Sequence, residues 1–67
     1  MDNVVIWTLK CFATYWIEDE TGKEVPLTNP TNSYHLMNEA MVEAKRRGIK
    51  HIIIVDEEGK QLRNQQM

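Results

Sequence analysis

Two short acidic stretches hold the side chains of this chain that are best suited to chemistry. DETGK spans residues 19–23 and DEEGK spans residues 56–60, so nearly the same pattern of carboxylates occurs twice. Paired carboxylates can bind a metal ion or serve as the general acid and base of a hydrolase. A calcium loop needs oxygen ligands at alternate positions and a closing glutamate at its twelfth position, and neither stretch has them. Catalytic carboxylates need a cleft that tunes their pKa values.

Each stretch also has the composition of a tight turn. An aspartate at the first position and a glycine at the fourth are favoured in a type I turn. Asp19 and Asp56 can accept hydrogen bonds from the backbone two residues on, and Gly22 and Gly59 can adopt positive φ without strain. Each stretch lies between two strand-like runs, so we predict two hairpin turns rather than a metal site or an active site.

The other residue types that perform catalysis are few and poorly spaced. His35 and His51 are far apart and show no metal-ligand spacing. Cys11 is the only cysteine, so it cannot form an internal disulfide, and its apolar surroundings predict a buried, inert side chain. We therefore expect no enzyme activity, no catalytic residues, no metal and no cofactor.

Length and composition indicate one small globular domain over residues 1–67. The net charge of −2 and the hydrophobic fraction of 42% are ordinary for a folded protein. The longest apolar run is far shorter than the ~20 residues that cross a bilayer, and Asp2 stands where a secretory signal would carry a basic residue. We expect a cytoplasmic protein with no membrane or small-molecule partner. Its small core would gain stability from a second copy or a partner protein.

Residues 4–17 are the most apolar part of the chain and predict a long first strand. The run is rich in β-branched and aromatic residues, and its odd positions are nearly all apolar. At ~3.3 Å per residue it is too long for a straight strand in so small a domain. We expect a bend or bulge near Lys10–Phe12, or an arm that reaches a second subunit. Residues 24–28 predict a short second strand at a sheet edge, because Pro26 lacks an N–H.

A helix is predicted from about Ser33 to Arg47. Its apolar residues recur at helical spacing, Asn32 or Ser33 can cap its start, and Gly48 suits its end.

The remaining residues predict two more strands. HIIIV at residues 51–55 indicates a central strand covered on both faces, and KQLRN can pair back as a fourth strand, with residues 64–67 frayed. We predict an α+β fold of the ββαββ type. Its antiparallel four-stranded sheet (order 2-1-3-4) has one helix packed on one face.

The predicted sheet leaves its second face uncovered. Odd positions of the first strand should meet the helix, which places Phe12 and Trp16, with Val4 and Ile6, on the opposite face. Exposed aromatic residues are typical of protein interfaces, although a twisted or bulged strand would bury the same residues in the core. We predict protein–protein interaction as the function, with another protein or a second copy as the partner. The predicted partner-binding residues are Phe12, Trp16, Glu18, Asp19 and Glu20.

The alternative is a small nucleic-acid-binding module. KRRGIK, residues 45–50, holds four of the eight basic residues, and Lys45, Arg46, Arg47 and Lys50 could contact phosphates. The same residues also suit the negative end of a helix dipole. The net negative charge makes nucleic acid the less favoured partner.

FATYWIEDETGKEVPL followed by NEAMVEAKRRG resembles small bacteriophage host-takeover proteins, such as the inhibitor of bacterial RNA polymerase from phage T7. The similarity lies in the order of a hairpin, one helix and a closing strand, and in a hairpin that ends in Glu-Val-Pro. It covers roughly residues 12–47, while the longer first strand and the DEEGK turn depart from it. The resemblance implies a compact, non-enzymatic, phage- or prophage-type accessory protein that occupies a surface of a host protein, and it carries over no binding residues.

Overall fold

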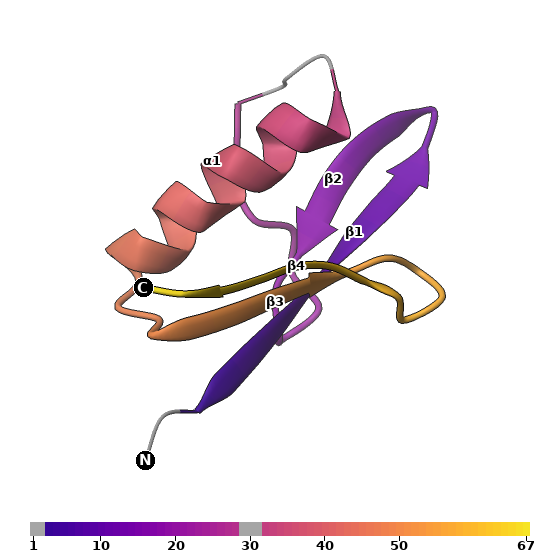
Figure 1. Cartoon of the computed structure of the whole chain (residues 1–67). Coiled ribbons are helices and arrows are strands. Elements are labelled where there is room, and N and C mark those ends of the chain that lie inside the picture. Colours follow the sequence, from indigo (N-terminus) through magenta and orange to yellow (C-terminus); the bar gives the residue numbers. More distant parts are fainter. Residues whose placement is uncertain (1–2, 29–31) are drawn as a thin grey trace.

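Four strands and one helix make up the part of the chain that the structure describes. The computed structural model describes residues 3–28 and 32–67. Along the chain it contains β1 (Val4–Phe12), β2 (Thr14–Glu18), α1 (Ser33–Arg46), β3 (His51–Val55) and β4 (Gln61–Gln66). The strands form one sheet in the order β2-β1-β3-β4, and α1 lies across one face of it (Figure 1). The predicted α+β class, the single helix and the strand order are confirmed.

The sheet is mixed, which corrects the prediction of an antiparallel sheet. β1 and β2 are antiparallel, as are β3 and β4, but the central strands β1 and β3 are parallel. The cause is one more chain reversal than the sequence indicated, a hairpin at Ala13 between β1 and β2. This reversal inverts the direction in which the chain enters α1, and therefore the direction of β3 relative to β1.

Ala13 divides the long apolar run into two strands. Among the described residues it is the one non-glycine residue with positive φ, 67°. This left-handed conformation costs an alanine roughly 1–2 kcal/mol, so the residue type gives no warning of the turn. Residues 4–17 therefore form a hairpin instead of one bent strand. The strand predicted at residues 24–28 is reduced to an isolated bridge between Glu18 and Glu24.

α1 begins and ends where its capping residues predict. The Asn32 side chain accepts a hydrogen bond from the backbone N–H of His35 at 2.9 Å, which is the usual N-cap arrangement. At the other end Gly48 has a φ of 77°, and the N–H of Ile49 donates to the Ala44 carbonyl at 3.0 Å. α1 spans Ser33–Arg46, so the predicted helix is confirmed. The signals that set its two ends act over a few residues of the chain.

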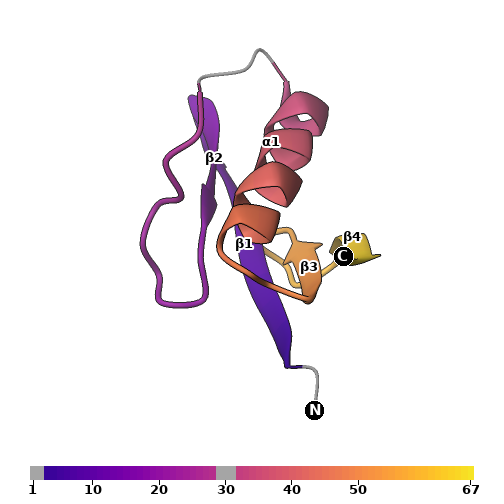
Figure 2. The ribbon, with the colours of Figure 1, turned by 90° about the vertical axis from the view of Figure 1, so that its left-hand side faces the viewer.

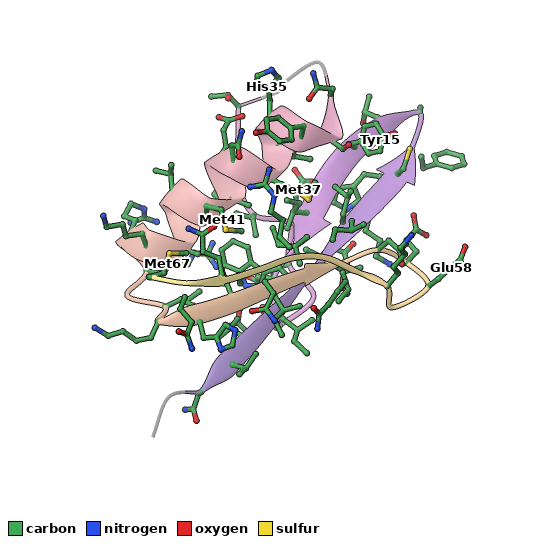
Figure 3. The ribbon with its side chains drawn as sticks, in the orientation of Figure 1. Tyr15, His35, Met37, Met41, Glu58 and Met67 are labelled. Atoms are coloured by element: carbon green, nitrogen blue, oxygen red, sulfur yellow. The ribbon has the colours of Figure 1, made fainter. Side chains whose placement is uncertain are left out.

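The core lies between α1 and the sheet face that α1 covers. Trp7, Leu9 and Ile17, at odd positions of β1 and β2, are buried on this face, as predicted. Figure 3 shows Met37 and Met41 on the side of α1 that faces the sheet. The buried residues are Trp7, Leu9, Ile17, Val25, Leu36, Ala40, Met41, Ala44, Ile52 and Ile54.

The opposite face of the sheet has no helix over it in the part of the chain that the structure describes (Figure 2). In β3, Ile52 and Ile54 are fully buried, whereas Ile53 between them is only partly buried. The prediction that this strand is covered on both faces is therefore wrong.

The C-terminal residues are paired. β4 continues to Gln66, and the N–H of Met67 donates to the Lys50 carbonyl at 2.9 Å. This corrects the prediction that residues 64–67 are frayed. The described residues include no helix with the length and hydrophobicity needed to cross a membrane.

Candidate protein-binding surface

The two acidic stretches form the same turn. In each, one carboxylate oxygen of the aspartate accepts the backbone N–H groups of the residues two and four positions later. Gly22 and Gly59 have φ values of 83° and 86°, and each donates its N–H to the carbonyl of its aspartate at 3.0 Å. The prediction of two turns is confirmed. Within residues 3–28 and 32–67, no group of three or more His, Cys, Asp or Glu side chains is placed to hold a metal ion.

The glutamate that follows the aspartate in each turn binds β1, a role that the sequence did not predict. Glu20 accepts a hydrogen bond from the indole N–H of Trp7 at 3.0 Å, and Glu57 accepts one from the backbone N–H of Cys11 at 3.0 Å. The two turns thus hold β1 from the ends of β2 and β3. The Asp-Glu pair that both turns share is the sequence signal for this contact with β1. Glu20 therefore stabilises the fold.

Asp19 is connected to the C-terminal end of α1. Its carboxylate lies 3.2 Å from the guanidinium of Arg47, which also contacts Glu43 at 2.8 Å and stacks 5.2 Å from the centre of the Trp7 ring. Arg46 binds the same Glu43 at 2.6 Å. The first acidic turn and the basic end of α1 therefore share one edge of the molecule.

These contacts keep two carboxylates ionised at low pH. Hydrogen bonding, led by the Thr21 hydroxyl, lowers the pKa of Asp19 from 3.8 to about 2. Arg46, followed by Arg47, lowers the pKa of Glu43 from 4.5 to about 2. A carboxyl whose pKa is lower in the folded state stabilises the fold above its unfolded pKa, and loses this contribution as the pH falls toward its folded pKa. Because both carboxylates are only partly buried and lie at the surface, solvent screening keeps the contribution small.

We therefore expect the melting temperature to fall as the pH is lowered from 4.5 to about 2, and to fall less steeply in a Glu43→Gln variant. Circular dichroism melting curves across this pH range measure the slope. Glu58→Gln is the matched control, because Glu58 projects from the tip of the second turn (Figure 3). It should keep the wild-type slope, and equal slopes for wild type and Glu43→Gln would contradict the prediction.

Trp16 and Glu18 lie together on β2. The indole N–H of Trp16 donates to Glu18 at 3.1 Å, and Lys10 of β1 lies 4.0 Å from the same carboxylate. Trp16 is partly buried, whereas Phe12 is 83% exposed at the end of β1. Cys11 is also exposed, which corrects its predicted burial and follows from the hairpin at this position.

The four basic residues of the predicted nucleic-acid site differ in whether they form salt bridges. Arg46 and Arg47 are engaged by carboxylates of α1 and of the first acidic turn. Among the described residues, no salt bridge includes Lys45 or Lys50, and both are exposed. Half of the predicted basic segment is therefore already paired inside the fold.

The open face of the sheet carries exposed apolar side chains. Val4 is 48% exposed, Ile6 50% and Phe12 83%. They occupy even positions of β1, so their side chains point away from α1. Ile53 lies beside Ile6 on β3, and Val55 follows on the same face; both are partly buried. We call Val4, Ile6, Phe12, Ile53 and Val55 the open-face patch.

The predicted partner-binding residues therefore divide into two groups. Phe12 belongs to the open-face patch, and Trp16 shares the face on the neighbouring strand β2. Glu18, Asp19 and Glu20 are all bonded within the fold. Val4 and Ile6, which the alternation along the first strand also predicted on this face, join the site because α1 covers the other face. Comparison of the chain with protein-family models, with curated proteins and with solved structures gives no match.

Proposed function

We propose that the chain is a non-enzymatic protein–protein interaction module that binds a second copy of itself through Val4 and Ile6 of the open-face patch. The observation that carries the proposal is the exposure of Val4 and Ile6, 48% and 50%, on one face of the four-stranded sheet. Exposed apolar patches on small proteins mark interaction sites. Phe12 and Trp16 at one end of this face are of the aromatic type that dominates interface energies.

A second copy suits this surface because all the side chains of the open-face patch are uncharged. Lys10 and Glu18 lie beside the patch and offset each other at 4.0 Å. Two identical faces can therefore meet without repulsion between like charges. Self-association would also widen the thin stability margin of a domain of this size.

The sequence resemblance supports the same class of activity, since it implies an accessory protein that acts by occupying a protein surface. A nucleic-acid-binding role for residues 45–50 is less well supported. Arg46 and Arg47 already bind Glu43, and phosphates would have to compete with this carboxylate for them.

Sedimentation equilibrium over a wide range of protein concentrations tests the proposal. We expect the wild type to dimerise, and Ile6→Lys to weaken dimerisation at least about tenfold, because the interface would have to bury an unpaired charge. Val42→Lys is the matched control, since Val42 is a 70% exposed valine on α1, outside the patch. It should dimerise as the wild type does. A wild type that stays monomeric at every concentration, or equal effects of the two lysines, would refute the proposal.

A further inference from the structure

β1 is longer than the strands that flank it, and this leaves part of its edge unpaired. β2 pairs with β1 from Thr8 to Phe12, and β3 pairs with it from Val4 to Thr8. On the β2 side, no strand in the described part of the chain accompanies residues 4–7. Figures 1 and 2 show this end of β1 projecting beyond β2.

The backbone groups on this edge that pair with no described strand belong to Val4 and Ile6. The backbone N–H of Cys11 points toward the β3 side, because it donates to Glu57 in the turn that follows β3. Successive residues of a strand direct their N–H and C=O groups to alternate sides. Even positions of β1 therefore face the β2 side. Thr8 finds its partner there on β2, and Val4 and Ile6 lie past the end of β2.

This edge lacks the protection that natural sheets give to their edges. Val4, Val5 and Ile6 include no proline and no charge, and β1 has no bulge in its pairing with β3. By contrast, the outer edge of β2 is partly covered, because the N–H of Val25 donates to the Ile17 carbonyl at 2.8 Å. β4, at the other edge, is polar in sequence and pairs with β3 through a register shift. An uncharged, β-branched edge is the one most prone to pair with another strand.

We infer that the second copy adds its own β1 to this edge, antiparallel, about a two-fold axis at Val5. Val4 of each copy then pairs with the partner's Ile6 through the free N–H and C=O groups of both. The side chains of these four residues meet on the open face and cover one another. The first acidic turn stands beside Trp7, where Glu20 binds the indole, so the partner strand stops there and the register is fixed.

The inference rests on the proposed function, but the same patch could also bind a second copy by stacking open face on open face. The two arrangements bury different groups of the protein. Edge pairing uses the backbone of Val4 and Ile6 and leaves Ile53 accessible. Stacking would bury Ile53 and leave the backbone N–H groups of Val4 and Ile6 in contact with water.

Amide hydrogen exchange and solution mass together distinguish these arrangements. In edge pairing, exchange at the Val4 and Ile6 amides of the wild type slows at least about tenfold when the concentration is raised into the dimeric range. Ile6→Pro removes an N–H that only the partner uses, and edge strands accept proline. This variant should remain monomeric with a melting curve close to that of the wild-type monomer, while Ile53→Lys should still dimerise.

Each alternative outcome is decisive. A wild-type dimer whose Val4 and Ile6 amides exchange as fast as in the monomer overturns edge pairing, and this measurement does not depend on whether any variant folds. A dimer that survives Ile6→Pro but is lost in Ile53→Lys also overturns edge pairing and leaves the proposed self-association standing by face stacking. A monomeric wild type overturns both.

Discussion

Replacing Trp7 with alanine is expected to unfold the protein or to leave it marginally stable at 25 °C. Trp7 is fully buried, and it is the largest buried side chain. Its ring packs in the core, its indole N–H binds Glu20, and the guanidinium of Arg47 stacks over it. Removing a buried tryptophan side chain costs about 3–5 kcal/mol. A domain of this length has a total free energy of unfolding of about 3–10 kcal/mol.

Trp16→Ala is the control that the chain itself provides. Trp16 is only partly buried, on the open face, and its indole N–H binds Glu18 two residues away. We expect this change to lower the free energy of unfolding by about 1 kcal/mol, the contribution of one such hydrogen bond with modest burial. Urea unfolding followed by circular dichroism measures both variants. A loss in Trp16→Ala as large as that in Trp7→Ala would place both indoles in the core and remove Trp16 from the candidate surface.

The features predicted correctly from the sequence are those that depend on residues close together in the chain. The cap at Asn32, the helix end at Gly48 and the two acidic turns each close within a few residues. Side-chain hydrogen bonds of this range depend little on the rest of the fold, so their residue types are strong signals.

The direction of β3 depended on one turn that the residue types do not mark. Ala13 adopts a positive φ that glycine or asparagine would normally supply. The surrounding pairs of β1 and β2 and their cross-strand contacts hold the turn in place, and such tertiary effects are not visible in a local window. Because each reversal inverts every later strand, one missed turn was enough to turn a mixed sheet into an antiparallel one.

Only part of the candidate surface was predicted from the sequence, because contacts between residues distant in the chain decide the rest. Alternation along β1 placed Phe12 on the uncovered face, as the structure does. The acids at residues 18–20 were expected to contact a partner, but they bind Trp16, Arg47 and Trp7. Sequence shows that a charge is present, whereas only the fold shows whether an internal partner already occupies it. Val4 and Ile6 are exposed because α1 lies on the other face of the sheet.

Ile52→Ala should be nearly as damaging as the loss of Trp7. Ile52 is fully buried in β3 and belongs to the core cluster beneath α1. Truncating a buried isoleucine to alanine removes apolar contacts and leaves a cavity, at a cost of about 2–5 kcal/mol. Since β3 is paired on both sides by β1 and β4, the strand cannot shift to fill that cavity without breaking its ladders.

Ile53→Ala is the matched comparison, because it makes the same chemical change one residue along the same strand. Ile53 faces the open side and is only partly buried, so the monomer should lose about 1 kcal/mol or less, in proportion to the smaller apolar area covered. Urea unfolding at low protein concentration isolates the monomer. Equal losses at Ile52 and Ile53 would mean that both faces of β3 are sealed within one chain. An open-face patch could not then exist, because the covered face would already have its partner inside the molecule.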